Sequence, residues 1–433
     1  MDKIKIHGGK SLNGKIFISG AKNAALPLIC ASLLTKDTVT LTNMPMLSDI
    51  KAMNALLLQM GTQIDEFDDF IDGHPTKTYA YRTPEASSLV APYDYVRKMR
   101  ASYYVLGPLL ARYGHVELSL PGGCAIGARP MDIHLSALEQ MGAAIEIKNG
   151  YIHANIDGRL KGAEIIFKIA SVGATCNILM AASMAEGVTK IENAAKEPEI
   201  GDLIDLLNDM GAKITGRDTS TLVIEGVPAL HSAVHKVIPD RIEAGSYAAA
   251  AAITRGRIEL INAQASTLQT PIKVMRDMGV DVTETPNSLI VDARGKKLVG
   301  QDIMTDFYPG FPTDLQAQFL AMMMTAEGAS MVTETIFENR FMHVPELLRM
   351  GANINVHGHA SAIVRGVAKL SGAPVMATDL RASFALVLAG LVAEGETVVN
   401  RVYHLDRGYE KLEEKLKGVG ADIERIKESD DAE

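Results

Sequence analysis

Cys124 stands in the segment LPGGCAIGARP, residues 120–130, where three glycines flank the thiol and a cation follows it. Glycines allow backbone angles that other residues avoid, so the segment predicts a surface loop. Pro130 suits the first position of a helix, and a helix N-terminus beside Arg129 favours anions. Positive surroundings also favour the reactive thiolate form of cysteine. The pattern predicts a reactive cysteine next to an anion; a buried structural cysteine is the alternative.

Length and composition limit the classes of protein to consider. A chain of 433 residues usually divides into two domains, and 47% hydrophobic residues with 22% charged residues are ordinary for a globular protein. The formal net charge of -9 gives no reason to expect nucleic acid as a partner. The longest apolar run, Phe384 to Ala393, is too short to cross a bilayer, and the N-terminus lacks the apolar core of a signal peptide. We expect a cytoplasmic protein with no membrane partner.

Metal and cofactor motifs are absent from the sequence. Cys30 and Cys176 lie among apolar residues, far from Cys124, so packing explains them better than a zinc site or disulfides. Neither a phosphate-binding P-loop nor a dinucleotide fingerprint occurs. We therefore expect no metal and no cofactor.

A six-fold internal repeat organises the chain. Each copy of the marker resembles LLLQMGTQI: an amphipathic helix, a glycine that ends it, and the start of a strand. The copies end at Ile64, Ile145, Ile214, Val282, Ile354 and Ile423, so successive intervals are 81, 69, 68, 72 and 69 residues. A second helix, apolar almost all round, precedes each marker, which is typical of a helix buried inside a domain. We predict six βαβαββ-type units, three in each of two α/β domains, with boundaries at 22–237 and at 1–21 plus 238–433.

Polar residues recur at the predicted starts of the buried helices, and four of the six are Lys or Arg. Lys or Arg at a helix N-terminus is disfavoured by the helix dipole, so such cations serve an external anion more often than the helix itself. The six positions are Lys22, Arg100, Ser171, Arg241, Asp314 and Arg381, and a second set, expected just before the amphipathic outer helices of the markers, comprises Arg129, Lys196, Arg340 and Arg407. If these helix starts share one face, they form a positive site for a substrate with phosphates and carboxylates.

Asp314 differs from its counterparts in the sign of its charge. The sequence TDLQ, residues 313–316, fits a capping box, which would place this carboxylate in the first turn of a helix. The carboxylate either stabilises the helix start or, among the cations, accepts a proton from a substrate hydroxyl.

The chain resembles the UDP-N-acetylglucosamine enolpyruvyl transferases (1-carboxyvinyltransferases) over nearly its whole length. The matching motifs are SGAKNAALP (19–27), RKMRAS (97–102), LPGGCAIGARPMD (120–132), SVGAT (171–175), NAAKEPEI (193–200), YPGFPTD (308–314), ENRF (338–341), DLRAS (379–383) and HLDRGYE (404–410). The resemblance implies an inside-out α/β barrel in two domains. It also implies transfer of the enolpyruvyl group of phosphoenolpyruvate to the sugar 3-hydroxyl, with phosphate released, at the start of peptidoglycan precursor synthesis.

The resemblance also assigns roles to individual residues. Cys124 matches the thiol that protonates the methylene carbon of phosphoenolpyruvate, forms a thioketal adduct with it, and is alkylated by the inhibitor fosfomycin. Asp314 matches the base for the 3-hydroxyl, and Arg340 is a further cation of the site. Phosphoenolpyruvate contacts match Lys22, Asn23, Arg129, Arg381 and Arg407. UDP-sugar contacts match Arg100, Arg129, Pro130, Met131, Asp132, Ile133, Ser171, Val172, Gly173, Asp314 and Ile336.

One residue departs from the family pattern, and two alternative functions are compatible with parts of it. Some members have a lysine two residues before the SVG motif, where this chain has Ile169, with Lys168 next to it. The sister transferase that acts on shikimate 3-phosphate shares the fold and the donor but lacks the cysteine loop. A catalytically silent paralogue that binds the UDP-sugar is the other alternative, and joint retention of Cys124, Lys22, Asp314 and Arg407 disfavours it. The sequence does not distinguish between two paralogous transferases or give an oligomeric state.

Overall fold

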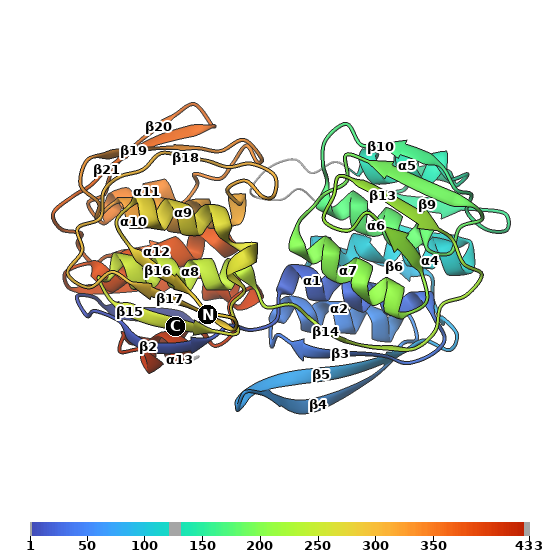
Figure 1. Ribbon diagram of the computed structural model, residues 1–433, viewed down its shortest axis with the longest axis horizontal. Coiled ribbons are helices and arrows are strands. Elements are labelled where there is room, and N and C mark those ends of the chain that lie inside the picture. Colours follow the sequence, from blue (N-terminus) through green and yellow to red (C-terminus); the bar gives the residue numbers. More distant parts are fainter. Residues whose placement is uncertain (1, 121–130, 428–433) are drawn as a thin grey trace. The chain divides into compact units, whose positions relative to one another are not determined.

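The computed structural model describes residues 2–120 and 131–427, which form two compact units. Unit 1 comprises residues 2–19 and 239–427, and unit 2 comprises residues 20–120 and 131–238. Both ends of the described chain therefore belong to unit 1, as the blue and red ribbons in Figure 1 show. Cys124, Arg129 and Pro130 lie outside the described residues.

All strands of unit 2 belong to three four-stranded sheets with one pattern. In each sheet the first two strands are parallel, and the remaining neighbours are antiparallel. The sheets are, in spatial order, β14 (Ala233–Lys236), β3 (Val39–Met44), β5 (His74–Arg82) and β4 (Gln63–Ile71); β6 (Val90–Ala91), β7 (His115–Ser119), β9 (Tyr151–Asn155) and β8 (Ala144–Lys148); and β10 (Glu164–Ile166), β11 (Val188–Glu192), β13 (Thr221–Glu225) and β12 (Lys213–Thr215).

Unit 1 repeats this pattern three times. Strands from opposite ends of the chain complete two of its sheets, because β1 and β2 pair with strands more than 200 residues later in the sequence. The sheets are β2 (Asn13–Phe17), β15 (Arg257–Ile261), β17 (Ser288–Asp292) and β16 (Asp281–Glu284); β18 (Ile303–Met304), β19 (Ala329–Thr333), β21 (Ser361–Arg365) and β20 (Asn353–His357); and β22 (Pro374–Met376), β23 (Glu396–Asn400), β1 (Lys3–His7) and β24 (Asp422–Ile426).

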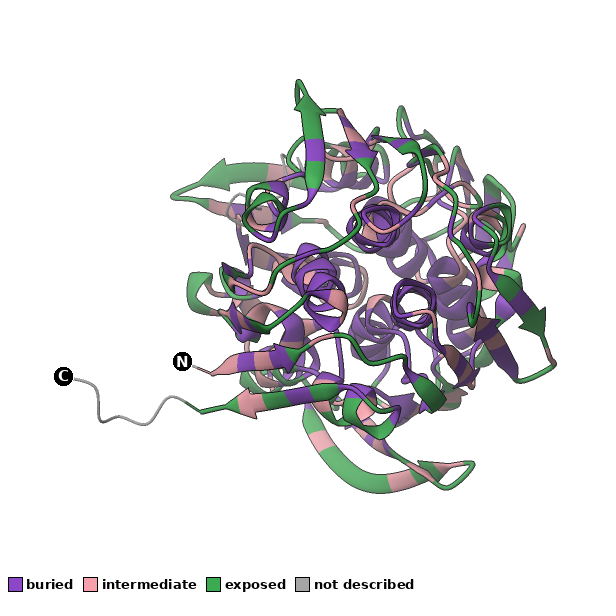
Figure 2. Cartoon of the chain, turned by 90° about the vertical axis from the view of Figure 1, so that its left-hand side faces the viewer, coloured by how far each residue is buried: buried purple, intermediate pink, exposed green. Residues whose placement is uncertain are grey.

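Three apolar helices occupy the centre of each unit, and the sheets and amphipathic helices surround them. Figure 2 shows the central helices of unit 1 as buried ribbons inside a shell of strands whose residues range from buried to exposed. The central helices are α1 (Lys22–Ala31), α4 (Leu106–Tyr113) and α6 (Val172–Ala182) in unit 2, and α8 (Arg241–Ile253), α10 (Gln316–Met323) and α12 (Leu380–Val392) in unit 1. The outer helices are α2 (Ser48–Gln59), α5 (Asp132–Gln140), α7 (Pro198–Asp209), α9 (Gln269–Asp277), α11 (Val344–Arg349) and α13 (Leu412–Gly418).

Short helical turns complete the described elements: α3 (Tyr93–Val96), η1 (Ser32–Leu34), η2 (Arg100–Val105), η3 (Ala265–Thr267), η4 (Thr313–Leu315) and η5 (Val402–Arg407). Two of them, η2 and η4, lead directly into central helices α4 and α10. The predicted α/β fold of six βαβαββ-type repeats is confirmed by the six equivalent sheets within the described residues. The apolar composition of the central helices has a simple cause, since side chains on every face of them are buried.

The longest repeat interval has a local explanation. β4 and β5 are nine residues each, whereas the equivalent β8 and β9 of the next repeat are five residues each. The extra residues lengthen a hairpin, which Figure 1 shows as a long curved ribbon at the edge of unit 2. The 81-residue interval after Ile64 therefore reflects a longer hairpin within the same fold.

Candidate active site

Asp314 lies between two buried guanidinium groups in unit 1. Nη2 of Arg340 donates to Oδ1 of Asp314 at 2.7 Å, and Nε of Arg381 donates to Oδ2 at 3.2 Å. The side chains of the arginines are 6% and 3% exposed, and that of Asp314 is 23% exposed. Burial is the largest single influence on the pKa of Arg381 and lowers it, but the interactions with Asp314, Tyr409 and Asp240 together outweigh burial and raise the pKa, so the cation persists.

Both arginines keep donors that the protein does not use. Nη1 and Nη2 of Arg381 and Nε of Arg340 are buried and lack hydrogen-bond partners within the described part of the chain. A buried donor without a partner is costly, and charged donors are the costliest. An anion placed against these N–H groups would satisfy them with charge-assisted hydrogen bonds.

The capping box predicted at residues 313–316 is wrong. η4 carries no side-chain cap, because its N-cap residue is Pro312, and the hydroxyl of Thr313 donates to Oε2 of Glu334 at 2.9 Å. The same carboxylate accepts from the hydroxyl of Thr305 at 2.9 Å and from the backbone N–H of Ile336 at 2.8 Å. Glu334 thus ties the turn that carries Asp314 to the end of β19. It also places Ile336, a predicted UDP-sugar contact, in the same network.

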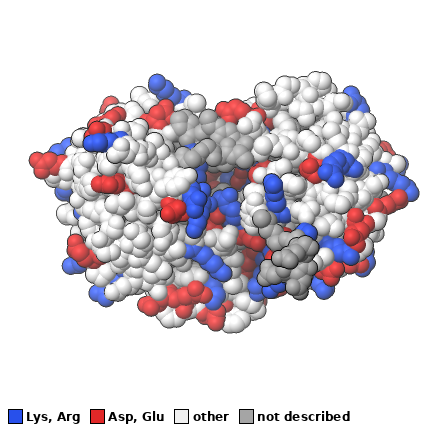
Figure 3. All heavy atoms as spheres, turned by 180° about the vertical axis from the view of Figure 1, so that it is seen from behind, with Lys and Arg blue, Asp and Glu red and all other residues white. Residues whose placement is uncertain are grey.

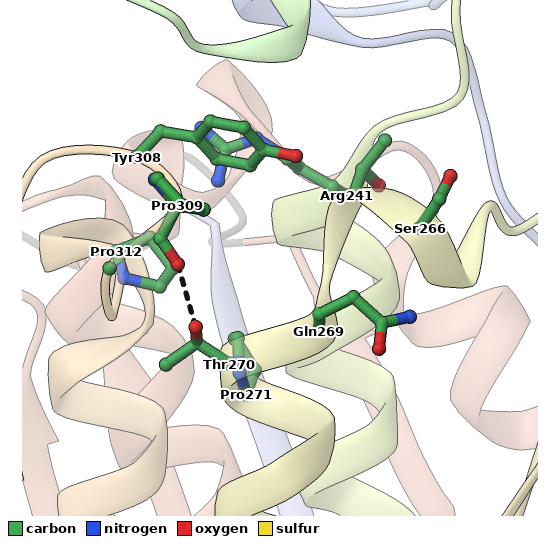
Figure 4. Close-up of a pocket in the computed structure, with 10 residues that line it drawn as sticks. Arg241, Ser266, Gln269, Thr270, Pro271, Tyr308, Pro309 and Pro312 are labelled. Carbon is green, nitrogen blue, oxygen red and sulfur yellow. Dashed lines mark hydrogen bonds between the residues drawn. The ribbon is translucent and has the colours of Figure 1, made fainter.

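The loop before Asp314 is anchored to α9. The hydroxyl of Thr270 donates to the carbonyl oxygen of Pro309 at 2.6 Å, shown as a dashed line in Figure 4. The guanidinium carbon of Arg241 lies 5.7 Å from the ring centroid of Tyr308, where a cation–π contact holds the loop from the α8 side. The hollow between these residues measures about 70 Å³, far below the roughly 300–1,000 Å³ of ligand pockets. We interpret it as support for the loop.

Lys22 has a partner that the sequence prediction did not include. It is the first residue of α1, as predicted, and its Nζ lies 3.5 Å from Oδ2 of Asp49 in the first turn of α2. Both side chains are buried, at 10% and 6% exposure. At 3.5 Å the ion pair with Asp49 is long, so the buried ammonium group of Lys22 can still attract an external anion. Asn23 follows in the same helix turn and is partly buried.

A histidine of defined tautomer lies beside the start of α6 in unit 2. Oδ1 of Asn177 accepts from the N–H of Gly107 at 2.9 Å, so its Nδ2 is the donor toward Nδ1 of His134 at 3.0 Å. The proton of the neutral imidazole is therefore on Nε2. Burial, assisted by the positive charge of Arg100, lowers the pKa of His134 to about 3, so the ring stays neutral near pH 7.

Gly173 lies close against this histidine group. A Cβ at Gly173 would come within 2.5 Å of the hydroxyl oxygen of Tyr103 and 3.1 Å of Cε1 of His134. The rings of Tyr103 and His134 are packed edge to face, with centroids 5.0 Å apart. Ser171 caps α6 by accepting from the N–H of Ala174 at 3.3 Å. The packing at the start of α6 therefore leaves no room for a side chain at position 173.

The remaining predicted residues occupy varied positions. Met131 is buried, Asp132 begins α5, and Ile133 and Val172 are partly buried. Arg407 is the last residue of η5, not the residue before an outer helix, and its charge contributes, after burial, to the lowered pKa of His404. Cys30 and Cys176 are fully buried, and burial raises their pKa, which confirms that they pack as apolar residues. Cys124, which the sequence predicts to lie on a loop, is outside the described residues.

The surface of each unit carries both signs of charge. On the face in Figure 3, lysine and arginine side chains alternate with aspartate and glutamate, with wide uncharged areas between them. Within the described chain, no set of three or more His, Cys, Asp or Glu residues is arranged to hold a metal ion. No helix among residues 2–120 and 131–427 is long and apolar enough to cross a membrane.

Comparison with known proteins defines the class. Residues 6–416 match the family model described as EPSP synthase (3-phosphoshikimate 1-carboxyvinyltransferase). The enolpyruvyl transferase NikO from Streptomyces tendae has a similar structure, with a TM-score of 0.87 at 24% identity over 98% of each chain. An EPSP synthase from Acinetobacter baumannii has a TM-score of 0.74 at 19% identity, over 99% of this chain and 100% of that one. The fold is that of the enolpyruvyl transferases.

Relatives in sequence narrow the class to one family. The chain is 60% identical over 429 residues to UDP-N-acetylglucosamine 1-carboxyvinyltransferase of Paramagnetospirillum magneticum, with 99% of each chain covered. It is also 60% identical over 426 residues to the enzyme of that name in Granulibacter bethesdensis, with 98% of this chain and 100% of the other covered. The chain belongs to the UDP-N-acetylglucosamine 1-carboxyvinyltransferase family.

Proposed function

We propose that the chain transfers the enolpyruvyl group of phosphoenolpyruvate to the 3-hydroxyl of UDP-N-acetylglucosamine and releases phosphate. This would be the first committed step of peptidoglycan precursor synthesis, carried out in the cytoplasm. The observation that carries the proposal is the geometry of Asp314, a partly exposed carboxylate between two buried arginines with unused N–H donors. Such a group can accept a proton while neighbouring cations bind an anionic donor.

The addition step needs a base, an acid and charge stabilisation. Asp314 takes the proton of the sugar hydroxyl as its oxygen attacks C2 of phosphoenolpyruvate, and Cys124 delivers a proton to the methylene carbon C3. The tetrahedral adduct keeps its phosphate on C2. Lys22, Arg381 and Arg407, with Asn23 and Arg129, hold the phosphate and carboxylate through charge-assisted hydrogen bonds. Arg340 stabilises the carboxylate of Asp314 at 2.7 Å.

Elimination then reverses the proton transfer at C3. Loss of that proton and of phosphate from C2 restores the double bond, now attached to the sugar oxygen. As a side path, the sulfur of Cys124 can itself add to C2 and give a thioketal adduct. That reactivity makes the same sulfur the proposed target of fosfomycin, whose epoxide opens when a thiolate attacks it.

The UDP-sugar would be bound mainly by unit 2. Ser171, Val172 and Gly173 form the start of α6, where backbone N–H groups suit a diphosphate. The sequence resemblance adds Arg100, and the run Arg129, Pro130, Met131, Asp132 and Ile133. Ile336 of unit 1 would be a further contact to the sugar, since its N–H and the hydroxyl of Thr313, the residue before Asp314, both donate to Glu334.

A two-substrate phosphate assay tests the function. Phosphate release should require both UDP-N-acetylglucosamine and phosphoenolpyruvate. Shikimate 3-phosphate in place of the UDP-sugar should give no release. Phosphate release from phosphoenolpyruvate with shikimate 3-phosphate, but not with the UDP-sugar, would assign the chain to the sister reaction. Binding of the UDP-sugar without turnover would indicate a silent paralogue.

The cysteine assignment has its own test. Intact-mass spectrometry should show one fosfomycin adduct on the unaltered chain and none on Cys124→Ser. Cys30 and Cys176 serve as internal controls, because both are fully buried. An adduct that persists on Cys124→Ser would point to another nucleophile.

A further inference from the structure

A buried hydrogen-bond chain lies beneath Asp314 and joins three parts of unit 1. Ser246 comes from α8, Gln318 from α10 and Tyr409 from the segment after η5, and all three are at most 2% exposed. Oγ of Ser246 lies 2.9 Å from the hydroxyl oxygen of Tyr409. Nε2 of Gln318 lies 3.1 Å from Oγ of Ser246, 3.0 Å from the Tyr409 hydroxyl and 3.0 Å from the carbonyl oxygen of Asp314.

The direction of each hydrogen bond follows from the number of protons. Ser246 has one hydroxyl proton, and it is donated to the carbonyl oxygen of Ile242 at 2.7 Å, one turn earlier in α8. Oγ of Ser246 is therefore the acceptor from Tyr409. Burial raises the pKa of Tyr409, although the cation of Arg381 opposes this, so the phenol keeps the proton that it donates.

The amide of Gln318 has one acceptable orientation. In the opposite orientation, its oxygen would lie 3.0 Å from the carbonyl oxygen of Asp314, which would place two acceptors together without a proton. With the nitrogen in that place, its two N–H groups supply Asp314 and the oxygen pair of Ser246 and Tyr409. Gln318 thus holds the backbone of the residue proposed as the base.

Tyr409 also contacts Arg381. The guanidinium carbon of Arg381 lies 5.6 Å from the ring centroid of Tyr409, within the range of a cation–π contact. On its other side, Arg381 reaches Asp314 through Nε alone at 3.2 Å, and Nη1 and Nη2 stay without partners in the described chain. If the Tyr409 ring were free to move, the guanidinium could rotate and form a two-pronged pair with Asp314, which would consume a donor needed by an anionic substrate.

We propose that Tyr409 and Gln318 are positioning residues for the reaction. Their hydrogen-bond chain to Ser246 fixes the Tyr409 ring against Arg381 and the backbone of Asp314 at the start of α10. The role of this chain in turnover rests on the function proposed above. Neither residue touches the substrate; they act through Asp314 and Arg381.

The experiment compares two tyrosines that each lose one buried hydroxyl. Tyr409→Phe removes the hydroxyl in the chain and keeps the ring. Tyr247→Phe is the matched control, because its hydroxyl is buried without a partner in the described residues and its ring also packs on Phe384. Tyr409→Phe should raise KM for phosphoenolpyruvate about tenfold and lower kcat about tenfold, with KM for the UDP-sugar within about twofold. Tyr247→Phe should leave kcat and both KM values within about twofold of those of the unaltered enzyme.

Two kinetic outcomes overturn the proposal: Tyr409→Phe behaving like the unaltered enzyme, or both tyrosine variants changing the constants equally. A double-mutant cycle between Tyr409→Phe and Gln318→Met, followed by urea unfolding, needs no turnover. The chain predicts coupling of about three- to tenfold in the unfolding equilibrium constant, and strictly additive effects would contradict it. If the unaltered enzyme shows no two-substrate turnover but the two variants are coupled in unfolding, the proposed function is refuted. The hydrogen-bond chain among Ser246, Gln318 and Tyr409 is then still supported.

Discussion

Oδ1 of Asp314 accepts from Nη2 of Arg340 at 2.7 Å, although 26 residues separate them in the chain. Arg381, 67 residues after Asp314, reaches the other carboxylate oxygen at 3.2 Å. The carboxylate is the most exposed of the three side chains, at 23% against 6% and 3%. The arrangement therefore presents a negative group to solvent and keeps its compensating charges underneath, as a base for an incoming hydroxyl requires.

Asp314→Asn should separate catalysis from binding. The amide keeps the shape of the side chain but cannot accept the hydroxyl proton, so kcat should fall by about 10²–10⁴. KM for UDP-N-acetylglucosamine should change much less, because binding also depends on the start of α6. Steady-state phosphate release at varied sugar concentration gives both constants.

Asp306→Asn is the matched control for this variant. Asp306 lies on the same loop and is exposed, and its Oδ1 accepts from the neighbouring N–H of Phe307 at 2.8 Å. It should retain normal constants. Equal losses in kcat and in sugar affinity for Asp314→Asn would reduce Asp314 to a binding residue.

Asp49→Asn should destabilise unit 2 through Lys22. The two side chains are 10% and 6% exposed, so removal of the carboxylate leaves a buried cation with less compensation. Loss of one partner of a buried pair costs about 3–5 kcal/mol of unfolding free energy. Urea unfolding should also show that Lys22→Met combined with Asp49→Leu is less destabilising than the sum of the single changes.

The exposed pair between Lys77 and Asp68, at 2.7 Å, is the control for the Lys22 pair. Asp68 is 83% exposed, so solvent screens the interaction and Asp68→Asn should leave the unfolding midpoint unchanged. Similar losses for Asp49→Asn and Asp68→Asn would mean that burial adds nothing to the Lys22 pair.

Gly173→Ala should weaken binding of the UDP-sugar and leave binding of phosphoenolpyruvate nearly unchanged. The new Cβ would meet the hydroxyl oxygen of Tyr103 at 2.5 Å, so the start of α6 or the tyrosine must shift. KM for UDP-N-acetylglucosamine should rise about tenfold or more, and KM for phosphoenolpyruvate should change little. Tyr103→Phe in the same chain should restore part of the affinity.

Gly418→Ala tests whether any glycine change has this effect. Gly418 ends α13, and a Cβ there would meet no atom within 4 Å. Alanine at this position should leave both KM values unchanged. A rise in phosphoenolpyruvate KM equal to that for the sugar in Gly173→Ala would contradict a specific role of α6.

The repeat pattern predicted the fold because it records packing directly. Helices with apolar residues on every side must be buried, and the six glycine-ended markers give the connection from an outer helix to its strand. The same reasoning placed Lys22, Ser171 and Arg381 at helix starts, where the structure has them. Pairing between distant segments, such as β1 with β23, depends on closure of the whole unit and has no local signal.

The site was harder to predict where the hydrogen-bond partner of a polar side chain is distant in the sequence. The capping box at Thr313 failed because the turn begins at Thr313 itself with Pro312 as its N-cap, and the Thr313 hydroxyl pairs with Glu334, which is distant in sequence. Asp49 and Asn177 were missed because nothing in their own helices marks them. Asp49 pairs with Lys22, and Asn177 hydrogen-bonds His134, and both partners are distant in the sequence. Periodicity identifies buried positions, but it does not identify which polar group a buried side chain will meet.

The buried His134 predicts a loss of stability in acid. Its pKa is about 3 in the folded protein and 6.5 ordinarily, so below pH 6.5 the unfolded chain binds a proton that the folded chain excludes. Stability should therefore fall as pH falls from 6.5 toward 3, by about 1.4 kcal/mol per pH unit for this one group. His134→Gln should flatten the pH dependence of urea unfolding between pH 6.5 and 5, whereas His7→Gln, at an exposed position, should not. An unchanged slope in His134→Gln would show that the ring is protonated in the folded protein over this pH range, which would contradict the lowered pKa.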